Sequence, residues 1–183
     1  MAMCENMKQR IAQRAPWPGI SGSGFTLIEV IMVVIIIGIA AAVVVPMMSS
    51  AGSMQIRAAV NMVAADLEYA KSMAISRGQP YSVVFDKATE TYRVVDQAGS
   101  VIQHPVRKGF NYVVDFRSDT RIDEVDIVDA SFDATSKVTF DYLGSPYNGS
   151  STPLNSGVVT LRSQGITKTV RVEPVTGFIT VSN

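Results

Sequence analysis

The most apolar stretch of the chain lies near its N-terminus and contains one charged residue. Residues 25–45, FTLIEVIMVVIIIGIAAAVVV, carry Glu29 and no other ionisable side chain. As a helix, they rise about 31 Å, which matches the roughly 30 Å hydrocarbon core of a bilayer. The stretch therefore predicts a membrane-spanning helix. Because Lys8, Arg10 and Arg14 precede it, the positive-inside rule predicts a cytoplasmic N-terminus and a C-terminal part on the far side.

The next segment has the period of an amphipathic helix. Over residues 53–77, apolar side chains recur every three or four positions, which places them on one face of a helix. Gly78 and Pro80 favour its end, because glycine caps helices and proline cannot continue one. We therefore expect one helix over 25–78, with its first part in the membrane and its second part packed on a domain. The stripe consists of Ile56, Val60, Val63, Leu67, Ala70 and Ala74.

After the helix the period shortens to two, which is typical of half-buried strands. The fold class predicted is α+β, with the long N-terminal helix packed on an antiparallel sheet formed by residues 79–183. Val138, Phe140 and Tyr142 should face the core, whereas the glycine- and serine-rich stretch 143–157 predicts a mobile loop without a regular element. The expected strands cover residues 81–85, 91–95, 137–142, 166–173 and 178–181.

The charge balance and the residue types offer little for catalysis or for disulfides. The 183 residues carry 16 bases and 16 acids, so no overall field attracts nucleic acid or anionic lipid. The single cysteine, Cys4, excludes a disulfide framework, and the single histidine, His104, has no visible partner for a catalytic triad. We therefore predict no enzyme activity, no catalytic residue and no cofactor.

The most acidic segment, residues 115–133, offers the oxygen atoms that calcium favours. Its spacing does not follow that of an EF-hand loop, and Arg117 and Arg121 lie among the acids. We expect a solvated loop or the edge of a strand there. No metal site is predicted, with calcium as the alternative.

A cleaved signal peptide and an uncleaved anchor are the alternatives for the N-terminal stretch. Residues 40–42 offer an A-x-A cleavage pattern after an apolar region. However, the polar region before it would be unusually long, the apolar run continues through Val45, and Glu29 interrupts its front. Cleavage ahead of the stretch, after a short basic leader that ends in glycine, would leave the helix in the mature chain.

The sequence GFTLIE, residues 24–29, resembles the processing motif of type IV pilins and type II secretion pseudopilins. The resemblance implies that a prepilin peptidase removes a leader, residues 1–24, by cutting after Gly24, and that it methylates Phe25. Glu29 would then be the fifth residue of the mature chain, where the family's glutamate docks subunits by pairing with an N-terminal amine. From near the helix end, Glu29 can alternatively extend to the cytoplasmic headgroups.

Three further residues of the apolar helix fit packing against neighbouring helices. Gly38 and Ala42 form a small-xxx-small pair, which lets another backbone approach closely. Pro46 removes a backbone hydrogen bond and predicts a kink near the outer end of the apolar stretch. In this respect the helix resembles those of pilin-like proteins, which have a proline at the position that corresponds to Pro46.

The C-terminal stretch VVTLRSQGITKTVRVEPVTGFITV, residues 158–181, resembles the GspH/FimT family of minor pseudopilins and minor pilins, as does VTF at 138–140. The resemblance implies a minor subunit of the type II secretion pseudopilus that assembles with other pseudopilins. Its helix would lie in the inner membrane, with a periplasmic C-terminal domain. The alternative is a type IV pilus minor pilin of FimT or FimU type, acting in pilus assembly or DNA uptake.

DNA is not an expected partner. In members of this family that bind DNA, arginines follow the glycine near the C-terminus, whereas here Gly177 is followed by FITVSN. Arg162, Lys168 and Arg171 can form only a modest basic stripe. Without residues 1–24 the chain has 13 bases and 15 acids, so its net charge is near −2 and does not favour contact with phosphates.

Overall fold

The computed structural model describes residues 24–182, without the side chains of residues 43–51. The predicted leader lies outside the described residues, apart from Gly24. The chain divides into two compact units, Met1–Val43 and Val44–Asn183, which are described separately below.

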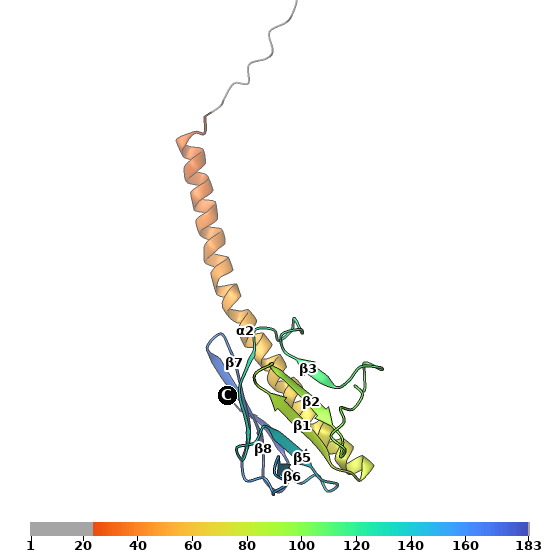
Figure 1. Cartoon of the computed structure of the whole chain (residues 1–183). Coiled ribbons are helices and arrows are strands. Elements are labelled where there is room, and N and C mark those ends of the chain that lie inside the picture. Colours follow the sequence, from red (N-terminus) through yellow and green to blue (C-terminus); the bar gives the residue numbers. More distant parts are fainter. Residues whose placement is uncertain (1–23, 183) are drawn as a thin grey trace, which may run out of the picture. The chain divides into compact units, whose positions relative to one another are not determined.

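One long helix, α2 (Leu27–Arg77), contributes residues to both units (Figure 1). It begins two residues later and ends one residue earlier than the predicted range 25–78. Gly78 has a φ of 65°, and the Gln79 N–H donates to the Ala74 carbonyl oxygen at 3.2 Å. This bond, combined with a glycine in the left-handed region, is the Schellman arrangement that satisfies the last carbonyl groups of a helix.

The second unit contains two antiparallel sheets (Figure 1). The five-stranded sheet has the order β3-β2-β1-β5-β6, and the four-stranded sheet has the order β4-β7-β8-β9. The first consists of β1 (Tyr81–Asp86), β2 (Thr91–Val95), β3 (Val113–Asp115), β5 (Lys137–Phe140) and β6 (Pro146–Asn148). The second consists of β4 (Asp126–Phe132), β7 (Gly157–Ser163), β8 (Ile166–Val172) and β9 (Ile179–Ser182).

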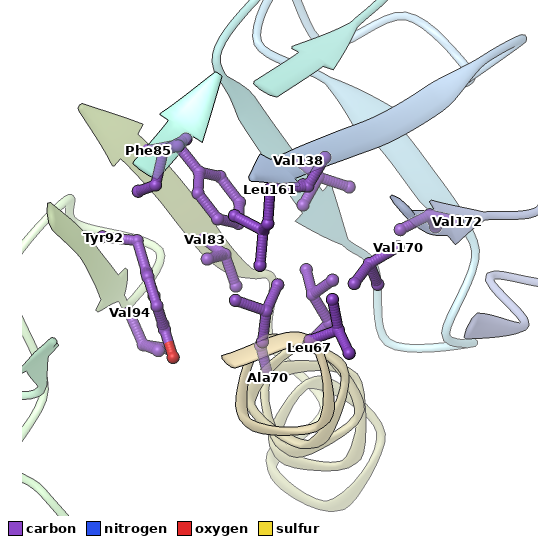
Figure 2. Packing of buried hydrophobic residues seen from close by; sticks show 14 of the residues in the cluster. Leu67, Ala70, Val83, Phe85, Tyr92, Val94, Val138, Leu161, Val170 and Val172 are labelled. Carbon is purple, nitrogen blue, oxygen red and sulfur yellow. The ribbon is translucent and has the colours of Figure 1, made fainter. Parts of the chain in front are cut away.

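Both sheets contribute to one core with the apolar stripe of α2. All six predicted stripe residues are buried, at 0–1% exposure. Figure 2 shows Val83 of β1 and Val170 and Val172 of β8 gathered over the helix face that carries Leu67 and Ala70. Because residues three and four apart share a helix face, a single stripe can contact two sheets at once.

The alternation of polar and apolar residues correctly predicted the central strands. β1 and β2 form the expected hairpin, with Val83 opposite Val94, and Val170 and Val172 of β8 are fully buried. Tyr142 was wrongly placed on the core face: β5 ends at Phe140, and the Tyr142 side chain is 59% exposed. A tight turn follows β5, in which the Asp141 carboxylate accepts the N–H groups of residues 143 and 145, so the alternation does not continue.

The prediction that residues 143–157 lack a regular element was wrong, because they contain β6. Pro146 fits there because β6 is the edge strand of its sheet, where a missing N–H costs no ladder bond. Asn148 is buried, and its side-chain oxygen accepts the N–H groups of Ser150 and Thr152 at 3.0 and 3.1 Å. A polar side chain of the kind that indicated a loop therefore accepts backbone N–H groups that no strand partner bonds.

The acidic segment, for which a solvated loop or the edge of a strand was expected, contains the strand β4. β4 forms one edge of the four-stranded sheet and pairs with β7. The acids around it are partly paired with the arginines of the same segment: Arg117 lies 2.6 Å from Asp126, and Arg121 lies 2.6 Å from Asp119. The hydrogen bond from Arg121 lowers the pKa of Asp119. β3, β4 and β7 were not among the predicted strands.

Candidate functional site

The first unit presents the predicted processing motif directly before the helix. Gly24, Phe25 and Thr26 precede α2 and are exposed. The Thr26 hydroxyl accepts the Glu29 N–H at 3.3 Å, and the Thr26 carbonyl accepts the Val30 N–H at 3.2 Å. Thr26 is thus the N-cap of α2. The bond between Gly24 and Phe25 consequently lies outside the helix.

The N-cap role of Thr26 was not predicted, although the pattern Thr-Leu-Ile-Glu contains a signal for it. A threonine followed three residues later by glutamate has the spacing of a capping box, a common helix start. Glu29 is therefore the third residue of the helix, near the positive end of the helix dipole, which favours a carboxylate. Within residues 24–182, its carboxylate has no hydrogen-bond or ion-pair partner.

The other predicted residues of the apolar helix are not brought into contact with another segment. Residues 24–42 are all exposed, and a methyl group added at Gly38 would meet no heavy atom within 4 Å. Ala42 is exposed as well, and Pro46 lies among the residues whose side chains are outside the described part of the chain. Among the side chains that the structure does describe, no helix is long and apolar enough to cross a membrane.

In the second unit, Asp66 of α2 is the centre of a half-buried polar cluster. Its carboxylate accepts the hydroxyl protons of Tyr92 at 2.5 Å and Tyr112 at 2.7 Å. Burial raises the pKa of Asp66, while the two hydrogen bonds and the nearby His104 oppose that rise. Burial, together with the Asp66 charge, also raises the pKa of both tyrosines. The cluster therefore ties α2 to β2 and to the segment before β3 through a shared carboxylate.

His104 completes this cluster but has a local structural role. Its ring stacks on Tyr112 with 4.6 Å between ring centroids, and Tyr69 stacks on Tyr112 at 5.5 Å. The His104 Nδ1 accepts the N–H groups of Val106 and Arg107, both at 3.1 Å. These bonds hold the turn that follows His104.

A polar cleft of about 640 Å³ lies beside the cluster. Asp66, His104 and Tyr112 line it together with Arg107 and Arg121. Across the described residues 24–182, no three His, Cys, Asp or Glu side chains lie close enough together to hold a metal ion. The cleft is thus lined by acidic, basic and apolar side chains. Its described residues include no cluster of metal ligands.

A known protein family matches most of the second unit. Residues 59–176 match the family described as Type II transport protein GspH. The chain belongs to the GspH family. The match covers the α2 stripe except Ile56, the Asp66 cluster and both sheets as far as the turn after β8. It does not include residues 24–29, so the roles of Gly24, Phe25 and Glu29 remain predictions.

Solved structures with a similar fold include the minor pseudopilin EpsH from the type 2 secretion system of Vibrio cholerae. It is 12% identical, with a TM-score of 0.49, and the alignment covers 69% of this chain and 94% of that one. The type IV minor pilin FimU of Pseudomonas aeruginosa is similar in two crystal forms. These are 19% and 21% identical, both with a TM-score of 0.46, and the alignments cover 69% of this chain and 92% and 87% of theirs. Comparison with curated proteins found no matching sequence.

Replacing Tyr92 with phenylalanine should destabilise this GspH-family domain. The variant leaves the Asp66 carboxylate with one fewer hydrogen bond, which costs about 1.5–3 kcal/mol for a bond to a charged group. Tyr69→Phe is the matched control, because among the described residues its hydroxyl has no hydrogen-bond partner, and it should change stability by less than about 0.5 kcal/mol. Denaturant unfolding of the full chain in detergent measures both.

The cost of Tyr92→Phe should depend on pH. The folded-state pKa of Asp66 is raised above its unfolded value, so the contribution of this group to stability falls as pH rises from about 4 through the folded pKa. The Tyr92 hydrogen bond favours the charged form of Asp66, so losing it raises the folded-state pKa of Asp66 further. The difference between Tyr92→Phe and the unaltered chain should therefore be larger at pH 7 than at pH 4, and an equal loss at both pH values would contradict the charge-assisted bond.

Proposed function

We propose that this chain is a minor pseudopilin of a type II secretion pseudopilus. The observation that carries the proposal is the GspH family match over residues 59–176. The GFTLIE motif supports it, because it lies directly ahead of an apolar helix that leads into the matched domain. The second candidate is a type IV pilus minor pilin, which has the same motif and the same domain family.

In the proposed maturation of the precursor, residues 1–24 are removed first. The geometry around Gly24 supports cleavage there, because Gly24 and Phe25 are exposed and the helix begins only at Leu27. Cleavage would leave Phe25 as an N-terminal residue one position before the Thr26 cap. Its amine would lie beside the helix start, one turn from the Glu29 carboxylate.

We further propose that the N-terminal half of α2 lies in the inner membrane, with the domain in the periplasm. Eleven large apolar side chains between Leu27 and Ile39 are at least 44% exposed, which an isolated protein in water would not tolerate as one contiguous surface. Lipid, or the helices of other subunits, would cover them. The basic residues Lys8, Arg10 and Arg14 favour a cytoplasmic N-terminus.

Glu29 is proposed to dock the subunit into the filament. A carboxylate at the centre of a membrane helix costs roughly 2.5–3.5 kcal/mol on insertion scales, so an acid in such a helix is a functional candidate. Among the described residues the Glu29 carboxylate has no partner. The N-terminal amine of a neighbouring subunit would supply one. Before assembly, the same side chain can extend to the headgroups from its place in the first turn.

Processing can be tested by the intact mass of the chain extracted from membranes. The expected mass is that of residues 25–183 plus one methyl group. Gly24→Ala should leave the leader in place, since the proposed cleavage follows this glycine, while Gly38→Ala, a control change within the helix, should be processed normally. A mature chain that starts at Val43, or an unprocessed chain, would contradict the proposal.

Glu29→Ala tests docking. The variant should insert and fold normally, because the Glu29 carboxylate has no hydrogen-bond or ion-pair partner among the described residues. Its incorporation into filaments should fall by roughly tenfold or more, as losing a partly buried ion pair predicts. Glu68→Ala is the matched control, with an exposed acid on the domain part of the same helix. Co-purification with partner subunits measures incorporation, and equal incorporation of both variants would refute the pairing.

A deletion strain distinguishes the two machines. The pseudopilin proposal predicts that secretion of exoproteins is lost while twitching motility and transformation remain. The opposite phenotype would establish the minor pilin. Complementation with the unaltered gene, and failure of the Glu29→Ala gene to complement, would tie the phenotype to assembly of this subunit.

A further inference from the structure

One end of the second unit carries a group of exposed apolar side chains. We call it the hairpin-end patch. It consists of Ile75, Tyr142, Leu143, Val175 and Phe178, which are 51%, 59%, 70%, 80% and 59% exposed. Its members come from the last turn of α2, from the turn after β5 and from the turn between β8 and β9.

Close backbone contacts join these three segments. A methyl group added at Gly144 would lie 3.0 Å from Cδ1 of Ile75, and one added at Gly177 would lie 2.6 Å from the Gly144 carbonyl oxygen. The Lys71 amino group donates to the Gly177 carbonyl at 3.0 Å. The patch residues next to these glycines therefore belong to one continuous surface.

Val175 is held in a strained backbone conformation at the tip of this surface. Its φ is 64°, a region that a β-branched residue rarely adopts, and the Thr176 N–H donates to the Pro174 carbonyl across it at 2.6 Å. A three-residue turn of this kind, with positive φ at its centre, is rare and costly. With its side chain 80% exposed, Val175 gains little packing within the domain in return for that cost.

The turn is also rigidly held. The Glu173 N–H donates to the Phe178 carbonyl at 2.8 Å, and the Gly177 N–H donates to the Glu173 carbonyl at 3.0 Å. Two apolar side chains, Val175 and Phe178, are thus presented on a pre-organised loop. Pre-organised apolar side chains are the usual anchors of protein interfaces, because little conformational entropy is lost when they bind.

The charge around the patch favours a folded protein as its occupant. Residues 173–182, EPVTGFITVS, contain no base, and the Lys71 amino group at the patch is already bonded to a carbonyl, so the last turn of α2 adds a single further base, Arg77. A lipid surface or a nucleic acid would require cations for its phosphates. Five side chains are also far fewer than the roughly 20–30 residues per side of a stable interface. The patch can therefore bind usefully only a partner already held nearby.

We propose that the hairpin-end patch inserts Val175 and Phe178 into an apolar pocket on the globular domain of a neighbouring pilin-like subunit. The inference rests on the proposed function, because a shared filament supplies the high effective concentration that a small interface needs. Since subunits of a filament are related head to tail, the patch meets a different surface of its neighbour and not a second copy of itself.

Val175→Asn tests the link between strain and binding, because asparagine accepts a positive φ and removes the apolar tip. The melting temperature of the full chain in detergent should rise by about 2–4 °C, while the amount of partner subunit that co-purifies should fall at least fivefold. Val106→Asn is the matched control, 83% exposed and outside the patch, and should leave co-purification unchanged. Unchanged co-purification with Val175→Asn would overturn the proposal, as would an equal loss with Val106→Asn.

A photo-crosslinking amino acid at position 178 identifies what the patch touches in living cells. The expected product joins this chain to a peptide from the globular domain of another pilin-like subunit. Crosslinks only to lipid, only to nucleic acid or only between two copies of position 178 would overturn the proposal. The same probe at position 35, in the apolar helix, reports filament assembly separately. If position 35 gives crosslinks to other subunits but position 178 does not give the expected product, only the patch proposal is overturned. If neither position gives crosslinks to other subunits, the proposed function is overturned.

Discussion

The apolar stripe of α2 is the constraint on which the rest of the domain depends. Ile56, Val63 and Leu67 are fully buried, and a helix with such a face cannot remain stable in water unless sheet residues cover it. Ala70 and Ala74 are equally buried, and their small side chains let two sheets approach the same helix closely. Larger residues there would force the sheets apart. The two sheets are thus joined through the helix that they share.

The features that follow from local periodicity could be predicted from the sequence. The stripe, the Gly78 cap and the β1–β2 hairpin each depend on residues a few positions apart, and each is present. β6 could not be predicted, because its order comes from the Asn148 side chain, which accepts the N–H groups of residues 150 and 152 and donates to the Asp133 carboxylate at 3.3 Å. Composition alone cannot distinguish a polar loop from a polar segment whose side chains satisfy its own backbone.

The domain's functional candidates depend on contacts between distant residues. Asp66 meets Tyr92 and Tyr112, 26 and 46 positions away, and nothing in its own sequence neighbourhood separates it from the solvated acids of the same helix. Val175 lies in the Pro-Val-Thr-Gly turn between two strands that the sequence predicts, 166–173 and 178–181. Its positive φ was not predictable, because the glycine of that turn is Gly177, two positions further on, and would be expected to take the left-handed conformation alone.

Two carboxylates on α2 illustrate how one helix can serve both folding and assembly. Asp66 is half-buried, and the domain itself supplies its partners, so its charge is satisfied as soon as the chain folds. Glu29 has no side-chain partner among the described residues, and apolar side chains surround it in sequence. An unpaired acid in apolar surroundings favours any state that brings a cation to it. Pairing of a carboxylate thus stabilises the single folded subunit at Asp66. At Glu29, pairing with the proposed N-terminal amine of a neighbour would favour the assembled filament.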